Sequence, residues 1–193
     1  MEKVLIVSDS HGEIMANSLR DDYKYKEEYK LEKLGTQDSL VGFTTNHDVE
    51  LDILILAGRT GFNFSNHLDL IKKDYSNHHI IFFLGYNDLP MLYGRNIENT
   101  VNKYISQACV KFDKSKKTVI TPLKNRQLIE QDPINSQYYD KYVFYMKKVC
   151  QELDIKCLDI YEIIGNVTDQ DYSDEHHLNA QRYFPIIDYA LSL

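Results

Sequence analysis

Short apolar runs recur along the chain at intervals that suit alternating strands and helices. Five of these runs are nearly continuous and end at a polar, Gly or Pro residue: Val4–Val7, Ile53–Ala57, Ile80–Leu84, Thr118–Thr121 and Ile155–Leu158. A parallel strand that is covered on both faces needs such a run, because neither of its faces meets water. The runs therefore predict a parallel sheet buried between two layers of helices.

Helical patterns separate these runs, at about residues 63–75, 97–112, 135–153 and 179–191. This alternation is typical of a doubly wound α/β fold with right-handed crossovers, and it predicts a three-layer α/β/α sandwich. Residues 27–42 are ambiguous, although Tyr29, Leu31 and Leu34 hint at an edge strand. No Pro/Gly/Ser-rich linker or internal repeat interrupts the chain, so we predict a single domain over residues 1–193.

Composition narrows the possible partners. The chain has 22 Lys and Arg against 29 Asp and Glu, a net charge of −7, and no basic stripe, so nucleic acid is not expected. No apolar run approaches the length of a membrane span or of a signal-peptide core, so we expect no membrane partner and a cytoplasmic location. The three cysteines have no Cys-x-x-Cys spacing, which indicates neither a zinc ribbon nor a disulfide framework.

Polar residues follow three of the predicted strands. The first strand ends in Ser-Asp-Ser-His-Gly (8–12), the second in Gly-Arg-Thr-Gly (58–61) and the third in Gly-Tyr-Asn-Asp (85–88). Each string alone is normal in a strand-to-helix turn. Because ligands bind beyond the carboxyl ends of the strands in such folds, three such strings at one edge of the sheet predict a functional site.

A fourth string near the C-terminus, Asp-Glu-His-His-Leu-Asn (174–179), places a carboxylate three residues before an imidazole. Asp174 could hold one ring nitrogen of His177 while the other nitrogen activates the hydroxyl of Ser10. The oxyanion that forms then needs preorganised donors, which the Ser10 backbone N–H, Gly58 and the Asn87 side chain could supply. This set of residues predicts acyl transfer, with Ser10 as nucleophile, His177 as base and Asp174 as its acid partner.

In this combination the chain resembles the SGNH (GDSL-type) hydrolases, whose name records four block residues, Ser, Gly, Asn and His. The matching residues span nearly the whole chain and are Ser10, Gly58, Asn87 and His177. The resemblance implies a flavodoxin-like five-stranded parallel sheet with strand order 2-1-3-4-5. It also implies ester hydrolysis or acyl transfer through an acyl-serine intermediate, without a metal or other cofactor.

The chain departs from the family pattern at one position, and the pattern also selects between two adjacent histidines. Ser8 stands where the family's Gly-Asp-Ser string begins with Gly, which could crowd the turn. The family's Asp-x-x-His-Leu block selects between the two adjacent histidines, because Asp174 lies three residues before His177. The resemblance therefore assigns the base to His177 and leaves His176 as a flanking residue that could line the cleft.

A metal enzyme is the main rival. Asp-Ser-His-Gly (9–12) after an apolar strand also resembles the first motif of calcineurin-like metallophosphoesterases, in which Asp9, His11 and Asn87 would be metal ligands. A two-metal site needs a bridging carboxylate at the end of the second strand, where this chain has Arg59. A later Gly-His-x-His string is missing as well. We therefore favour the serine mechanism and predict no bound metal.

The sequence thus predicts a serine esterase that cleaves a small acyl ester, with O-acetyl groups on a carbohydrate as the first candidate. The modest chain length and the absence of long apolar insertions favour a short acyl group. The expected partner is a small-molecule or glycan ester, and Arg59 could reach an anionic part of it. Two alternatives stay open: an O-acyltransferase with the same triad, and a non-catalytic module that binds glycans or esters.

Overall fold

The computed structural model of the chain describes residues 1–21, 28–34, 38–45, 48–61, 71, 73–126, 130, 132 and 134–193. Within them, seven strands form one sheet: β1 (Glu2–Ser8), β2 (Glu28–Lys33), β3 (Asp38–Thr44), β4 (Val49–Leu56), β5 (His79–Phe83), β6 (Lys116–Ile120) and β7 (Lys156–Leu158). The α-helices are α1 (Ser10–Asp21), α2 (Ile97–Lys111), α4 (Ile134–Glu152), α5 (Ile160–Ile164) and α6 (Phe184–Leu191). Three 3₁₀ helices add Tyr86–Met91, Asp169–Asp171 and Ala180–Tyr183.

The sheet has the order β2-β3-β4-β1-β5-β6-β7. Its five parallel strands, β4, β1, β5, β6 and β7, stand in the expected order 2-1-3-4-5. The expectation of five strands was wrong by two, because β2 and β3 extend the β4 edge in antiparallel pairing. The hinted edge strand is confirmed as β2, although Leu34 lies just past its end.

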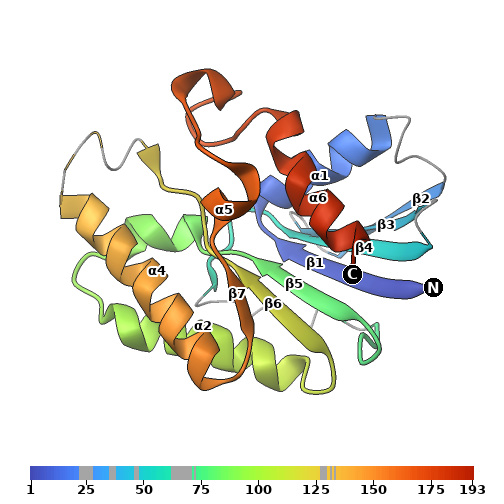
Figure 1. Cartoon of the computed structure of the whole chain (residues 1–193), viewed down its shortest axis with the longest axis horizontal. Helices are drawn as coiled ribbons and strands as arrows, with labels where there is room; N and C mark the ends of the chain where they lie inside the picture. Colours follow the sequence, from blue (N-terminus) through green and yellow to red (C-terminus); the bar gives the residue numbers. More distant parts are fainter. Residues whose placement is uncertain are drawn as a thin grey trace.

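Helices cover both faces of the sheet, as Figure 1 shows, with α1, α5 and α6 on one face and α2 and α4 on the other. Successive residues of β1 point to opposite faces: Val4 and Ile6 pack in the first layer, and Leu5 and Val7 in the second. All four side chains are fully buried. The near-continuous apolar runs therefore arise from burial on both faces, and the predicted three-layer sandwich is confirmed.

The predicted helices 97–112 and 135–153 correspond to α2 and α4 within a residue at each end. The predicted helix 179–191 is a 3₁₀ helix that runs into α6. The predicted helix 63–75 falls largely outside the described residues, and its last three residues, 73–75, are not helical. No helix in the described part of the chain is both long enough and apolar enough to span a bilayer.

Ser8 is accommodated by a glycine one turn into the next helix. Its side chain is fully buried at the end of β1, and its hydroxyl donates to the Phe83 carbonyl over 3.0 Å. A Cβ atom added to Gly12 would lie only 2.8 Å from the Ser8 Cβ. Gly12 therefore leaves the space that the Ser8 side chain needs, and the strand-to-helix turn tolerates the departure from Gly-Asp-Ser.

Candidate active site

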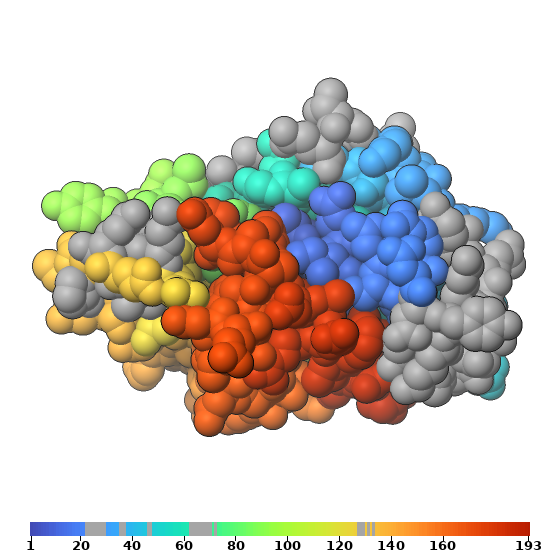
Figure 2. All heavy atoms as spheres, turned by 90° about the horizontal axis from the view of Figure 1, so that it is seen from above, coloured from blue at the N-terminus to red at the C-terminus, as the bar shows by residue number. Residues whose placement is uncertain are grey.

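The two ends of the chain meet where the parallel strands end. Ser10 is the first residue of α1, and His177 lies in the loop between the last two 3₁₀ helices. The C-terminal segment packs directly against the N-terminal residues in Figure 2. The Nε2 atom of His177 lies 2.8 Å from the Oγ atom of Ser10, so the fold joins two residues that are 167 positions apart.

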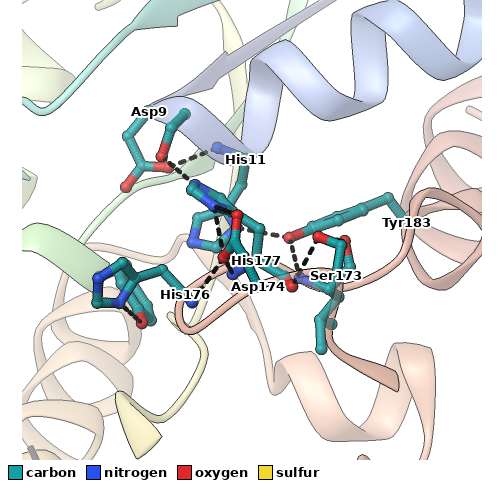
Figure 3. A network of polar contacts seen from close by, with 10 residues as sticks. Asp9, His11, Ser173, Asp174, His176, His177 and Tyr183 are labelled. Atoms are coloured by element: carbon teal, nitrogen blue, oxygen red, sulfur yellow. Dashed lines mark hydrogen bonds and ion pairs between the residues drawn. The ribbon is translucent and has the colours of Figure 1, made fainter. Parts of the chain in front are cut away.

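Asp174 holds the His177 ring and its loop at the same time. Its two oxygens lie 3.0 and 2.9 Å from His177 Nδ1, and its Oδ1 atom also accepts the backbone N–H groups of His176 and His177, each over 2.7 Å (Figure 3). Partial burial pushes the pKa of Asp174 up, but these hydrogen bonds outweigh it and lower the pKa to about 2. With the ring proton on Nδ1, the carboxylate accepts the hydrogen bond from Nδ1–H, and Nε2 can then accept a proton from the Ser10 hydroxyl.

The position of Ser10 favours negative charge. The first N–H groups of an α-helix have no partner within the helix, and the helix dipole places positive potential at this end. Ser10 occupies the first helical position of the twelve-residue α1. An oxyanion formed beside Ser10 would therefore lie at the positive end of a helix.

Asn87 connects the ends of three neighbouring strands. Its Nδ2 group donates to Asp9 Oδ2 over 3.0 Å and to the Arg59 carbonyl over 3.3 Å. Asp9 follows β1, Arg59 follows β4, and Asn87 follows β5. The structure thus brings the three polar strings of the sequence together at one edge of the sheet.

Gly58 lies in the turn after β4 and has a positive φ of 68°. A Cβ atom at this position would meet nothing within 4 Å. Glycine is needed here for its backbone conformation and not for close packing. Its role as an oxyanion donor stays a prediction, as does that of Asn87.

The two residues suggested for substrate binding have partners within the protein. Arg59 Nε lies 3.6 Å from Oδ1 of Asp38, a buried carboxylate at the start of β3. His176 Nδ1 lies 3.3 Å from the Tyr86 hydroxyl, and the His176 side chain is half-buried beside His177. Their contact with a substrate stays a prediction.

Two buried ionisable groups, Asp9 and His11, lie next to the candidate triad, and the sequence did not predict their shifted pKa values. Burial, together with the nearby charge of Asp88, raises the pKa of Asp9 to about 7. Burial, together with the neighbouring His177, lowers the pKa of His11 to about 3. The sequence singled out both residues only as candidate metal ligands, because their shared string Asp-Ser-His-Gly was the sole local signal. Tyr183, which contacts His11, carries no signal in the sequence at all.

The residues required for the rival metal site are engaged with one another. Asp9 accepts hydrogen bonds from Asn87 and from the His11 backbone N–H, and His11 Nδ1 lies 2.6 Å from the Tyr183 hydroxyl. In the parts of the chain that the structure describes, no group of three or more His, Cys, Asp and Glu side chains could hold a metal ion. The geometry of these residues favours the serine reading.

No protein-family model and no curated protein sequence matches the chain. Solved structures do match over nearly its full length. A GDSL-like lipase from Bacteroides thetaiotaomicron VPI-5482 has a TM-score of 0.67 at 14% identity, over 99% of this chain and 88% of its own. The native M. smegmatis aryl esterase has a TM-score of 0.61 at 12% identity, over 100% and 97% of the two chains.

A member of the lipolytic protein G-D-S-L family from Veillonella parvula DSM 2008 has a TM-score of 0.59 at 14% identity, over 100% and 98% of the two chains. Similarity at this level of identity concerns the backbone and not the reaction. In its fold, therefore, the chain is an α/β/α sandwich similar to the structures of these G-D-S-L family proteins.

Proposed function

We propose that the chain is a serine ester hydrolase of the SGNH type, with Ser10 as nucleophile, His177 as base and Asp174 as the acid that orients the base. One observation carries the proposal: a continuous series of hydrogen bonds runs from Asp174 through His177 to Ser10, over 2.9 and 2.8 Å. Nucleophile, base and orienting acid in this geometry are the requirements of acyl transfer. The fold shared with lipases and esterases supports the same class of reaction.

In the proposed reaction, Ser10 Oγ attacks the acyl carbon while its proton passes to His177 Nε2. Asp174 stabilises the imidazolium through the Nδ1 proton. The imidazolium then gives its proton to the leaving alcohol, which leaves an acyl group on Ser10. Water attacks this intermediate while His177 takes its proton, and the second tetrahedral species collapses to the acid as the imidazolium returns the proton to Ser10 Oγ.

The oxyanion of each tetrahedral species would accept from the Ser10 backbone N–H, Gly58 and Asn87. Both Asn87 amide hydrogens have partners in the free protein. The longer bond, 3.3 Å to the Arg59 carbonyl, is the one that an oxyanion would replace. The shorter bond to Asp9 would keep the carboxamide in its orientation.

For the substrate we propose a short acyl ester of a carbohydrate, with an O-acetyl group as the first candidate. A groove of about 550 Å³ lies beside the triad and is lined by Asp174 together with Arg126, Asp169 and Tyr172. The Arg126 guanidinium lies 5.7 Å from the centre of the Tyr172 ring and 3.1 Å from Asp169. An aromatic face next to charged hydrogen-bonding groups suits a polyhydroxyl alcohol better than an acyl chain.

The test is the hydrolysis of p-nitrophenyl acetate by the wild type and by Ser10→Ala and His177→Ala, with and without a chelator. We expect each variant to lose about 10³-fold or more in kcat, and the chelator to have no effect. Ser192→Ala, an exposed serine near the C-terminus, is the matched control and should keep full activity. Activity that survives Ser10→Ala but disappears with the chelator would establish a metal enzyme instead.

The same protein samples separate the remaining alternatives. Acetylated oligosaccharides are offered with and without an excess of a free sugar acceptor, and the products are identified by mass. A hydrolase releases acetate in both cases, whereas an O-acyltransferase forms a new ester on the acceptor. Binding of the acetylated oligosaccharide without any turnover would replace the enzyme by a binding module.

A further inference from the structure

His11 is a buried histidine beside the candidate base, and the proposed reaction does not use it. Its side chain is 1% exposed, and its ring centroid lies 5.2 Å from that of His177. The letters G-D-S-L, which name the family of one structural neighbour, correspond here to Ser8, Asp9, Ser10 and His11. An imidazole therefore stands in this chain where that name has leucine.

Tyr183 links His11 to the residue that follows the base. Its oxygen accepts the backbone N–H of Leu178 over 3.2 Å. The hydroxyl hydrogen is then left to donate to His11 Nδ1, 2.6 Å away, and Figure 3 shows the two side chains pointing toward each other beside His177. Through this pair of hydrogen bonds, the start of α1 is tied to the backbone directly after His177.

The His11 ring also packs against the side of the His177 ring. The planes of these two rings meet at 62°, and the centre of the Tyr86 ring lies 4.9 Å from that of the His11 ring, with the two planes nearly perpendicular. Burial lowers the pKa of His11 to about 3, so the ring is uncharged at neutral pH. A neutral ring can contact His177 closely without repelling the imidazolium that forms during turnover.

The imidazole of His11 buries an unsatisfied polar atom, which an apolar side chain would avoid. Its Nδ1 atom accepts from Tyr183, so the neutral ring carries its proton on Nε2. Within the described part of the chain, this Nε2 atom is buried and has no hydrogen-bond partner. Leucine would fill the space without an unsatisfied donor, but it could not accept the Tyr183 hydrogen bond. The acceptor at Nδ1 is therefore what the imidazole contributes.

We infer that His11 is a positioning residue, which acts with Tyr183 to keep the His177 Nε2 atom within reach of the Ser10 hydroxyl. This inference rests on the proposed function, because only a serine hydrolase needs that alignment. His11 takes part in no proton transfer or bond change of the proposed reaction. It acts on the ring of His177 by packing and on the backbone of Leu178 through Tyr183.

Three variants test the inference. His11→Leu fills the space without an acceptor, Tyr183→Phe removes the hydroxyl alone, and His11→Asn keeps an acceptor near the place of Nδ1. We expect the first two to lower kcat on p-nitrophenyl acetate about 10- to 100-fold with KM changed less than about twofold, and His11→Asn to restore most of kcat. Tyr189→Phe, a tyrosine of α6 whose hydroxyl lies near Thr118, is the matched control and should change nothing.

A second measurement does not depend on turnover. The imidazole ¹⁵N shifts of His177 report how the ring proton is divided between Nδ1 and Nε2. We expect the Nδ1–H form to dominate in the wild type and in His11→Asn, and the two forms to mix in His11→Leu and Tyr183→Phe. If the wild type has no esterase activity but the shifts respond in this way, the proposed function fails while the positioning of His177 stands.

Two results would overturn the inference. One is an unchanged kcat in His11→Leu together with unchanged His177 shifts. The other is a lower kcat that accompanies only a lower melting temperature, again with unchanged shifts and with no rescue in His11→Asn. Either result would make His11 a filler of the core and not a positioning residue.

Discussion

Replacing Asp174 by asparagine exchanges one carboxylate oxygen for an amide nitrogen. We expect this change to move the ring proton of His177 from Nδ1 to Nε2. Oδ1 of Asp174 accepts two backbone N–H groups over 2.7 Å, while Oδ2 lies 2.9 Å from His177 Nδ1. In Asp174→Asn the amide oxygen would keep the place of Oδ1 and its two backbone bonds. The amide N–H₂ group would then occupy the place of Oδ2 and face the Nδ1 proton.

The amide N–H₂ group cannot accept the Nδ1 proton, and the amide oxygen, 3.0 Å from Nδ1, already accepts two backbone N–H groups. An unprotonated Nδ1 can instead accept from the N–H₂ group, so we expect the ring proton to move to Nε2 and His177 to lose its capacity to accept from Ser10. A wrong tautomer of this kind costs about 10³- to 10⁴-fold in kcat/KM, or about 4 to 5.5 kcal/mol. Loss of the negative charge of Asp174, without a change of tautomer, should lower kcat/KM far less. The Asp174 side chain is 56% exposed, and its attraction for the imidazolium is screened to about 1 kcal/mol.

The assay is the initial rate of p-nitrophenyl acetate hydrolysis by the wild type and by Asp174→Asn at equal folded concentration. Glu175→Gln is the matched control, because it removes the same charge from the adjacent exposed residue and should cost less than about fivefold. A loss of less than about tenfold in Asp174→Asn would refute the reasoning. It would mean that the carboxylate contributes its charge and does not decide the tautomer.

Three further changes should affect stability, measured by urea denaturation. Tyr142→Phe removes a buried hydrogen bond of 3.0 Å to Asp88 and should lower the unfolding free energy by about 1–3 kcal/mol. The exposed control Tyr93→Phe should change it by less than about 0.5 kcal/mol, and equal effects of the two variants would contradict this prediction. Gly58→Ala places a residue with a side chain at a backbone φ of 68° and should lower the unfolding free energy by about 1–2 kcal/mol. An unchanged denaturation midpoint would contradict the positive φ at this turn. Because burial raises the pKa of Asp9 from 3.8 to about 7, the folded chain keeps a proton there that the unfolded chain releases. The unfolding free energy should therefore fall as the pH rises through this range; Asp9→Asn should flatten this slope, and an identical slope would disprove the assignment.

The parallel part of the sheet could be predicted because its signal is local. A strand such as β5 is buried on both faces, and every residue from Ile80 to Phe83 must therefore be apolar. The helices α2 and α4 follow from apolar positions spaced at the helical repeat. The antiparallel strand β3 has no such run at its start: Asp38 and Ser39 are polar yet buried, where they pair with the end of β4.

Some features of the candidate triad could likewise be predicted from the sequence, whereas others could not. The spacing of Asp174 and His177 is a local fact, and the sequence alone determined that one loop carries an acid and an imidazole in reach of each other. It also determined that Ser10 follows a buried strand, which places a hydroxyl at the ligand edge of the sheet. Resemblance to known blocks joined these pieces, although no distance between them could be read from the chain.

Only the tertiary structure decided the rest, because the remaining contacts join residues that have no fixed spacing in the sequence. The 2.8 Å approach of Ser10 to His177 depends on how α1 and the C-terminal loop pack over the same sheet edge. The burial of His11 against Tyr183 depends on the same packing, 172 positions apart along the chain. The sequence determines the chemical type of each side chain. Its protonation state and its hydrogen-bond partner depend on the neighbours that surround it in the folded chain.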